Sequence, residues 1–117
     1  MAEFITPGML GRRAVNHSEE ARARRIWERA NTAMRLSRPQ PFSTLAEPIP
    51  TSVALAWLLT RAGVPRQQAI ELLRVSGVGL ARSLATVRAA RADPPIADWL
   101  DELAGAMPSF HDCGEVA

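Results

Sequence analysis

The most informative part of this chain is the stretch Leu72-Leu73-Arg74-Val75-Ser76-Gly77-Val78-Gly79-Leu80-Ala81-Arg82-Ser83-Leu84-Ala85-Thr86-Val87. Apolar residues at helical spacing stand on both sides of Gly77-Val78-Gly79, which predicts two helices joined by a turn at these glycines. Glycine adopts positive φ readily and has no side chain, so a ligand can come close to such a turn. The second helix, expected from about Leu80 to Ala90, presents free N–H groups at its start that favour an anion.

N-terminal to this stretch, a basic amphipathic helix is expected at residues 16–36. Asn16 and Glu19 form a capping-box pattern at its start, and apolar residues recur along one stripe at helical spacing. A second face carries three arginines at i, i+3 and i+7 spacing: Arg22, Arg25 and Arg29. Like charges at such spacing repel one another, so this face is either solvated or matched by a partner anion.

Residues 37–50 contain four prolines and separate this helix from the rest of the chain. Proline does not fit a helix interior, so the segment is expected to be an extended connector pinned by Phe42 and Leu45. Residues 1–15 and the acidic residues 108–117 are expected to form flexible ends.

Residues 51–107 are expected to form a compact helical domain. Thr51 or Ser52 caps a helix that is apolar on nearly every side and ends at Gly63. Another helix starts near Pro65, and the last one follows Asp93-Pro94-Pro95. No segment alternates with period two, so the chain is predicted to be all-α, a compact bundle of about five helices. The predicted inward-facing residues are Ala23, Ile26, Trp27, Ala30, Met34, Trp57, Ala69, Ile70, Leu72, Leu73, Leu80, Leu84, Val87, Ile96, Trp99, Leu100, Leu103 and Met107.

Charge is distributed unevenly along the 117 residues. Residues 1–92 hold 14 arginines and 6 acidic residues, a net charge of +8, whereas residues 93–117 hold 6 acidic residues and no basic one. A basic body suits a polyanion. The acidic end either limits non-specific binding or pairs with the body.

Composition excludes several classes of protein. Aromatic residues make up 5% of the chain and tyrosine is absent, which disfavours a binder of single strands because such proteins stack bases on aromatic rings. No apolar run is long enough to span a bilayer, and the N-terminus lacks a signal-peptide core. The single cysteine, Cys113, allows no internal disulfide, which agrees with a reducing cytoplasm. His111-Asp112-Cys113 lacks the spacing of a metal or nucleophile site, so we expect no catalysis, metal or cofactor.

The pattern of a leucine pair, Gly-hydrophobic-Gly and a following small residue resembles the helix-hairpin-helix motif. Ser83 stands where that motif usually has alanine, and Ser76 where it often has proline. Residues 70–88, and more loosely the order of elements over residues 17–105, resemble the actinobacterial integration host factor family. This resemblance implies a helical domain that bends or bridges duplex DNA. The Pro-rich segment 39–50, the absence of lysine and the acidic character of residues 96–107 depart from the family's pattern.

These features predict a cytoplasmic, nucleoid-associated protein that binds double-stranded DNA mainly through phosphates, of architectural or recombination-accessory type. Arginine beside the turn suits this role because its planar guanidinium bonds a phosphate bidentately. The predicted contact residues are Arg22, Arg25, Arg29, Arg66, Arg74, Gly77, Val78, Gly79 and Arg82.

Two alternatives remain open at this point. Residues 58–70 suggest a helix-turn-helix regulator, with Arg66, Gln67 and Gln68 at the start of a helix that reads base edges. A protein-interaction adaptor of phage or plasmid origin is the other, in which the stripe of residues 23–34 docks on a protein partner or a second copy. If the arginines of residues 16–36 and Arg74 and Arg82 form one continuous face, DNA is favoured; scattered arginines and an open apolar patch favour a protein partner.

Overall fold

The computed structural model describes residues 7–42 and 47–113, with side chains described for residues 18–42 and 47–111. The described residues form only helices: α1 (Pro7–Leu36), α2 (Thr51–Ala62), α3 (Arg66–Leu73), α4 (Gly77–Ala90), α5 (Pro94–Gly105) and the single turn α6 (Phe110–Cys113). The predicted all-α fold is confirmed.

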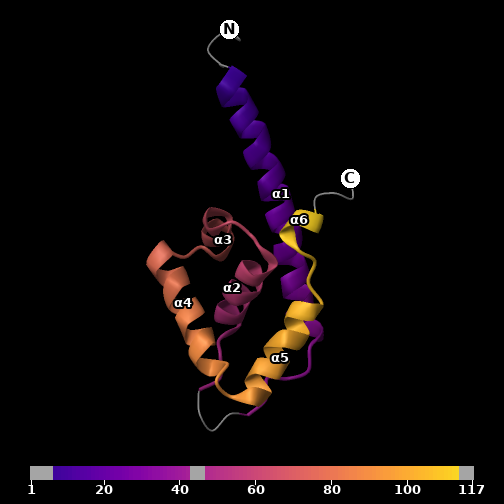
Figure 1. The fold of residues 1–117 in the computed structure, drawn as a ribbon, viewed down its shortest axis with the longest axis vertical. Helices are drawn as coiled ribbons and strands as arrows, with labels where there is room; N and C mark the ends of the chain where they lie inside the picture. The colour runs from indigo at the N-terminus through magenta and orange to yellow at the C-terminus, as the bar shows by residue number, and fades with distance from the viewer. Residues whose placement is uncertain (1–6, 43–46, 114–117) are drawn as a thin grey trace.

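Helix α2 is the centre of the bundle and contacts α1, α3, α4 and α5 (Figure 1). In this view α4 lies on one side of α2, and α5 and α6 lie on the other, along α1. The N-terminal part of α1 extends beyond the other helices. The all-round apolar character of α2 is explained by this position, because a helix enclosed by neighbours has no polar face to keep.

Two hydrophobic clusters share α2. The first joins the C-terminal half of α1 to α2, α4 and α5, with Leu58, Val87, Trp99 and Leu100 among its buried residues. The second joins α1, α2 and α3 to the start of α4 and to α6. It contains Ala23, Ile26, Ala56, Leu59, Val64, Ala69, Leu80 and Phe110. The predicted inward-facing residues are therefore shared between two clusters, and Trp27, Leu73 and Met107 pack against both.

Polar contacts hold the connector (residues 37–50) in place, whereas the sequence predicted that apolar residues would do so. The Gln40 side-chain amide donates to the Ile49 carbonyl oxygen at 3.1 Å and accepts from the Ile49 N–H at 2.7 Å. The indole N–H of Trp99 donates to the Arg38 carbonyl oxygen at 3.1 Å. Phe42 is 85% exposed, so the predicted pinning by Phe42 is wrong. Leu45, the other residue predicted to pin the connector, lies outside the described residues.

Two helix starts differ from the prediction. Helix α1 begins at Pro7, so Asn16 and Glu19 lie inside the helix and the capping-box pattern marks no start. Proline suits a first helical position because its missing N–H would have no partner there. Thr51 and Ser52 lie within α2, which follows Pro50 and has no side-chain cap.

Residues 108–113 differ from the flexible end that is expected for residues 108–117. Phe110 is 5% exposed and belongs to the second cluster, and α6 contacts α1. The buried ring of Phe110 holds this segment against the bundle. The sequence did not predict this contact because a single helical turn is too short to show periodicity. Among the described residues, no helix combines the length and apolarity that crossing a bilayer requires.

Candidate nucleic-acid interface

The turn between α3 and α4 consists of Arg74, Val75 and Ser76, not of the glycines. Arg74 adopts the left-handed conformation at φ 58° and ψ 48°, while Gly77 already belongs to α4. Among the described residues only Arg74 and Gly63 have positive φ, so the predicted turn at Gly77-Val78-Gly79 is wrong. The Oγ atom of Ser76 accepts a hydrogen bond from the Gly79 N–H at 2.9 Å. This N-cap starts the helix three residues earlier than predicted.

Gly77 is required for a close approach instead of a turn. The guanidinium of Arg66, at the start of α3, lies beside the Cα of Gly77. A Cβ atom at this position would overlap Nη2 of Arg66 and lie 3.1 Å from its Cζ. A Cβ at Gly79 would lie 3.3 Å from the Ser76 Oγ, so this second glycine gives the cap its room.

The N-terminus of α4 is a local positive site. Ser76 takes up the Gly79 N–H, and the N–H groups of Gly77 and Val78 have no partner among the described residues. These free donors and the helix dipole attract an anion. The guanidinium of Arg66 stands at the same helix end, and within the described part of the chain it makes no ion pair.

The charged residues of α3 and α4 are mostly basic. Residues 66–90 hold four arginines and one glutamate, a net charge of +3. The glutamate, Glu71, accepts a hydrogen bond from Gln67 at 3.3 Å. Arg74 and Arg82 are exposed, and in the described segments neither has an acidic partner. Sequence reasoning missed Arg88, which is also exposed on α4 and was detectable as a further arginine on an acid-free helix.

Helix α4 has a buried and an open face. Leu80 and Val87 are buried against the bundle, as predicted. Val78 is 67% exposed, and Arg82 and Thr86 are also open to solvent. The open face therefore combines small or apolar residues with arginine and carries no acid.

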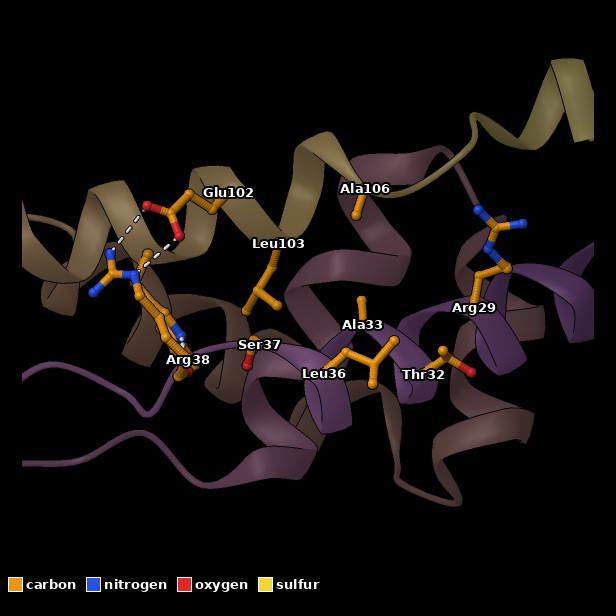
Figure 2. A pocket seen from close by; sticks show the side chains of 10 residues that line it. Arg29, Thr32, Ala33, Leu36, Ser37, Arg38, Glu102, Leu103 and Ala106 are labelled. Carbon is orange, nitrogen blue, oxygen red and sulfur yellow. Dashed lines mark hydrogen bonds and ion pairs between the residues drawn. The ribbon is translucent and has the colours of Figure 1, made fainter.

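The arginines of α1 do not extend this surface in one continuous face. The Arg22 guanidinium lies 5.1 Å from the ring centroid of Phe110 in α6. Arg29 lines a cavity together with residues of α5 (Figure 2). In Figure 1 α5 and α6 lie on the opposite side of α2 from α4. Arg25 is exposed on α1. The predicted residues thus divide into an α3–α4 group and, for Arg22 and Arg29, an α1 group near α6 and α5. The single continuous basic face that would favour DNA is not formed, so a DNA contact depends on the α3–α4 group alone.

The helix-turn-helix suggested for residues 58–70 has the expected glycine but not the expected reading residues. Gly63 ends α2 at φ 96°. Gln68 is only 9% exposed, and Gln67 is engaged with Glu71. A buried side chain does not reach a base edge, so Arg66 is the one member of that trio with both exposure and an uncommitted side chain.

The acidic end of the chain pairs with the basic body. Glu102 of α5 accepts two hydrogen bonds from the Arg38 guanidinium, at 3.0 and 3.1 Å. This hydrogen bonding lowers the pKa of Glu102 and raises the pKa of Arg38. Asp101 pairs with Arg91 at 2.9 Å, and the same guanidinium lies 5.1 Å from the Trp57 ring centroid. Glu102 thus pairs with the connector and Asp101 with Arg91, the residue that ends α4, and neither pairs with an arginine of α3.

Comparison with known proteins found no matching family model, no similar curated protein and no similar solved structure. The resemblance of residues 70–88 to the integration host factor family therefore stays a prediction. Among the described residues, no group of histidine, cysteine and acidic side chains is arranged to hold a metal ion.

Proposed function

We propose that the protein binds double-stranded DNA through α3 and α4, mainly by phosphate contacts, as an architectural or recombination-accessory protein of the nucleoid. One observation carries the proposal: the Arg66 guanidinium stands beside Gly77, where the free N–H groups of the α4 N-terminus also lie. A phosphate oxygen accepts hydrogen bonds from both kinds of donor.

Electrostatics favour an anion at this place. A guanidinium and the positive end of a helix dipole repel each other, and a bound phosphate turns that repulsion into attraction on both sides. Arg74 lies at the α3–α4 turn, and Arg82 is exposed one helical turn beyond Val78. Such contacts place a protein on a duplex without reading its sequence.

The chemistry of the surface favours duplex over single-stranded nucleic acid. Residues 66–90 contain no phenylalanine, tyrosine or tryptophan. Single-strand binders obtain much of their affinity by stacking bases on aromatic rings, and α3 and α4 have none to offer. A rigid helical unit with arginines suits the regular phosphate rows of a duplex.

Salt-dependent binding to short duplexes of unrelated sequence tests the proposal. If Arg66, Arg74 and Arg82 each neutralise one phosphate, the log–log slope of affinity against salt is about −3. Arg66→Ala and Arg82→Ala should each weaken binding to all duplexes alike and reduce the slope by about 0.9. The matched control is Arg35→Ala, because Arg35 is exposed at the end of α1 and hydrogen-bonded to Thr32.

Two results would reject phosphate binding at this surface. One is an affinity that does not change with salt, and the other is an Arg35→Ala effect equal to that of Arg66→Ala. A loss confined to one duplex sequence would instead support the helix-turn-helix regulator, because base contacts are sequence-dependent and phosphate contacts are not.

A further inference from the structure

An open groove runs between the C-terminal end of α1 and α5. It encloses about 450 Å³ and is lined by apolar surface from Ala33, Leu36, Trp99, Leu103 and Ala106 (Figure 2). The groove is open to solvent and would not enclose a small molecule on most sides, as small-molecule sites do. Its form suits a docking protein surface.

Leu36 supplies an apolar side chain at the edge of this groove. It is the last residue of α1 and is 80% exposed. A surface with a large exposed apolar side chain beside an apolar groove can insert that side chain into a partner and can bind a partner's side chain in the groove. Each copy of the chain therefore offers a leucine and the groove in which a leucine can be buried.

The two ends of the groove carry opposite charge. Arg29 lies at one end, and in the described residues it has no ion-pair partner. Glu102, paired with Arg38, lies at the other end (Figure 2). Asp98 precedes Glu102 by one turn of α5, and its charge reaches Arg38. Arg38 offsets only one of the two carboxylates of Asp98 and Glu102, so these three residues together have a net charge of −1.

From this pattern we infer that a second copy of the chain docks on the groove, related by a two-fold axis that sets the two grooves antiparallel. The basic end of each copy then faces the acidic end of the other, and the two Leu36 side chains are buried between the copies. A two-fold interface must be self-complementary, and the opposite charges at the two ends of this groove meet that condition. An unrelated acidic segment would match Arg29 but would leave Asp98 and Glu102 facing like charge.

The inference is independent of the proposed DNA binding. The groove lies along α5, on the opposite side of α2 from α4 in Figure 1, so docking leaves the α3–α4 surface uncovered. The dimer would present two such surfaces. The test uses the full chain without DNA, so its result does not depend on whether DNA binds.

Sedimentation across a wide range of protein concentration tests the second copy directly. The chain should form a dimer, and Leu36→Glu should make it monomeric with an unchanged circular dichroism spectrum, because Leu36 is exposed. Val78→Glu is the matched control, since Val78 is 67% exposed but lies on α4; it should leave the dimer intact. A monomer at all concentrations, or a dimer that survives Leu36→Glu, would overturn the inference.

Charge reversal provides a second test that does not depend on Leu36. Arg29→Glu and Asp98→Arg should each raise the dimer dissociation constant about tenfold or more, because each places like charges opposite each other. The double variant Arg29→Glu with Asp98→Arg should return the dissociation constant to within a few-fold of the original value. If the double variant is as weak as the singles combined, the antiparallel arrangement is wrong.

Discussion

The guanidinium of Arg66, the first residue of α3, lies directly beside the Cα of Gly77, the first residue of α4. Eleven positions separate the two residues in sequence, and the three-residue turn at Arg74 brings the two helix starts together. The contact places a cation at the positive end of a helix, which stabilises a bound anion and not the free protein. Changes at this contact are therefore expected to lower DNA affinity without lowering the stability of the fold.

Gly77→Ala should weaken DNA binding without unfolding the protein. The new Cβ occupies the place of the Arg66 guanidinium, which is the end of a flexible side chain and moves aside at little cost. Alanine also improves helix propensity by up to about 1 kcal/mol, so the melting temperature should hold or rise slightly. Affinity for duplex DNA should fall several-fold, as measured by fluorescence anisotropy.

Gly105→Ala is the control for that variant. A Cβ at Gly105, in the last position of α5, meets no atom within 4 Å. It should leave DNA affinity unchanged. Equal affinities of the Gly77→Ala and Gly105→Ala variants would mean that the position of the Arg66 guanidinium does not matter for binding.

Arg74→Gly should stabilise the fold and still weaken DNA binding. Arg74 is held at φ 58°, a conformation that costs a residue with a Cβ about 1 kcal/mol and costs glycine nothing comparable. Chemical denaturation should therefore show a gain of up to about 1 kcal/mol for Arg74→Gly and no gain for Arg74→Ala. Both variants remove the same charge, so both should lose DNA affinity equally. A stability gain in the alanine variant would show that charge, not backbone conformation, is responsible.

Most of the fold follows from apolar periodicity. The stripes of α4 and α5 and the all-round apolar α2 are long enough for their spacing to identify both the helix and its buried face. Helix boundaries were less predictable because several local signals compete. Asn16 and Glu19 match a capping box, yet the chain N-terminal to them continues the helix to Pro7. Phe110 anchors a turn of four residues, which no periodicity can reveal.

The sequence indicated the residues of the candidate site, whose role stays a prediction, but not how they are arranged. Arginine and glycine near residues 74–82 indicated a phosphate contact, but two glycines in succession also suggested a turn. The Ser76 side chain decides otherwise, because its hydrogen bond to Gly79 makes the glycines a first helical turn. The division of Arg22 and Arg29 from α3 and α4 depends on how α1 packs against α5 and α6, which no local pattern in α1 contains.

Glu102 should titrate at lower pH than an ordinary glutamate. Its hydrogen bonds from Arg38 lower its pKa below the usual 4.5. A lowered folded-state pKa means that the pair contributes its stability above the unfolded-state value, and that this contribution is lost as pH falls through the folded-state pKa. NMR titration of the Glu102 carboxyl should show this pKa, and Arg38→Gln should return it toward 4.5. Arg35→Gln should leave it where it is; an unshifted pKa in Arg38→Gln would mean that the pair does not form in solution.

Phe110→Ala should destabilise the protein strongly although it lies near the end of the described chain. Its ring is 5% exposed, packs with residues of α1 and α2, and carries the Arg22 guanidinium 5.1 Å from its centroid. Truncating a buried phenylalanine removes transfer free energy and leaves a cavity, at a cost of about 3 kcal/mol. Phe42→Ala is the control, because Phe42 is 85% exposed and the same change there should cost less than about 0.5 kcal/mol. Urea denaturation of both variants measures the difference. Equal midpoints would mean that α6 is not docked, and that residues 108–117 behave as the flexible end that their composition predicts.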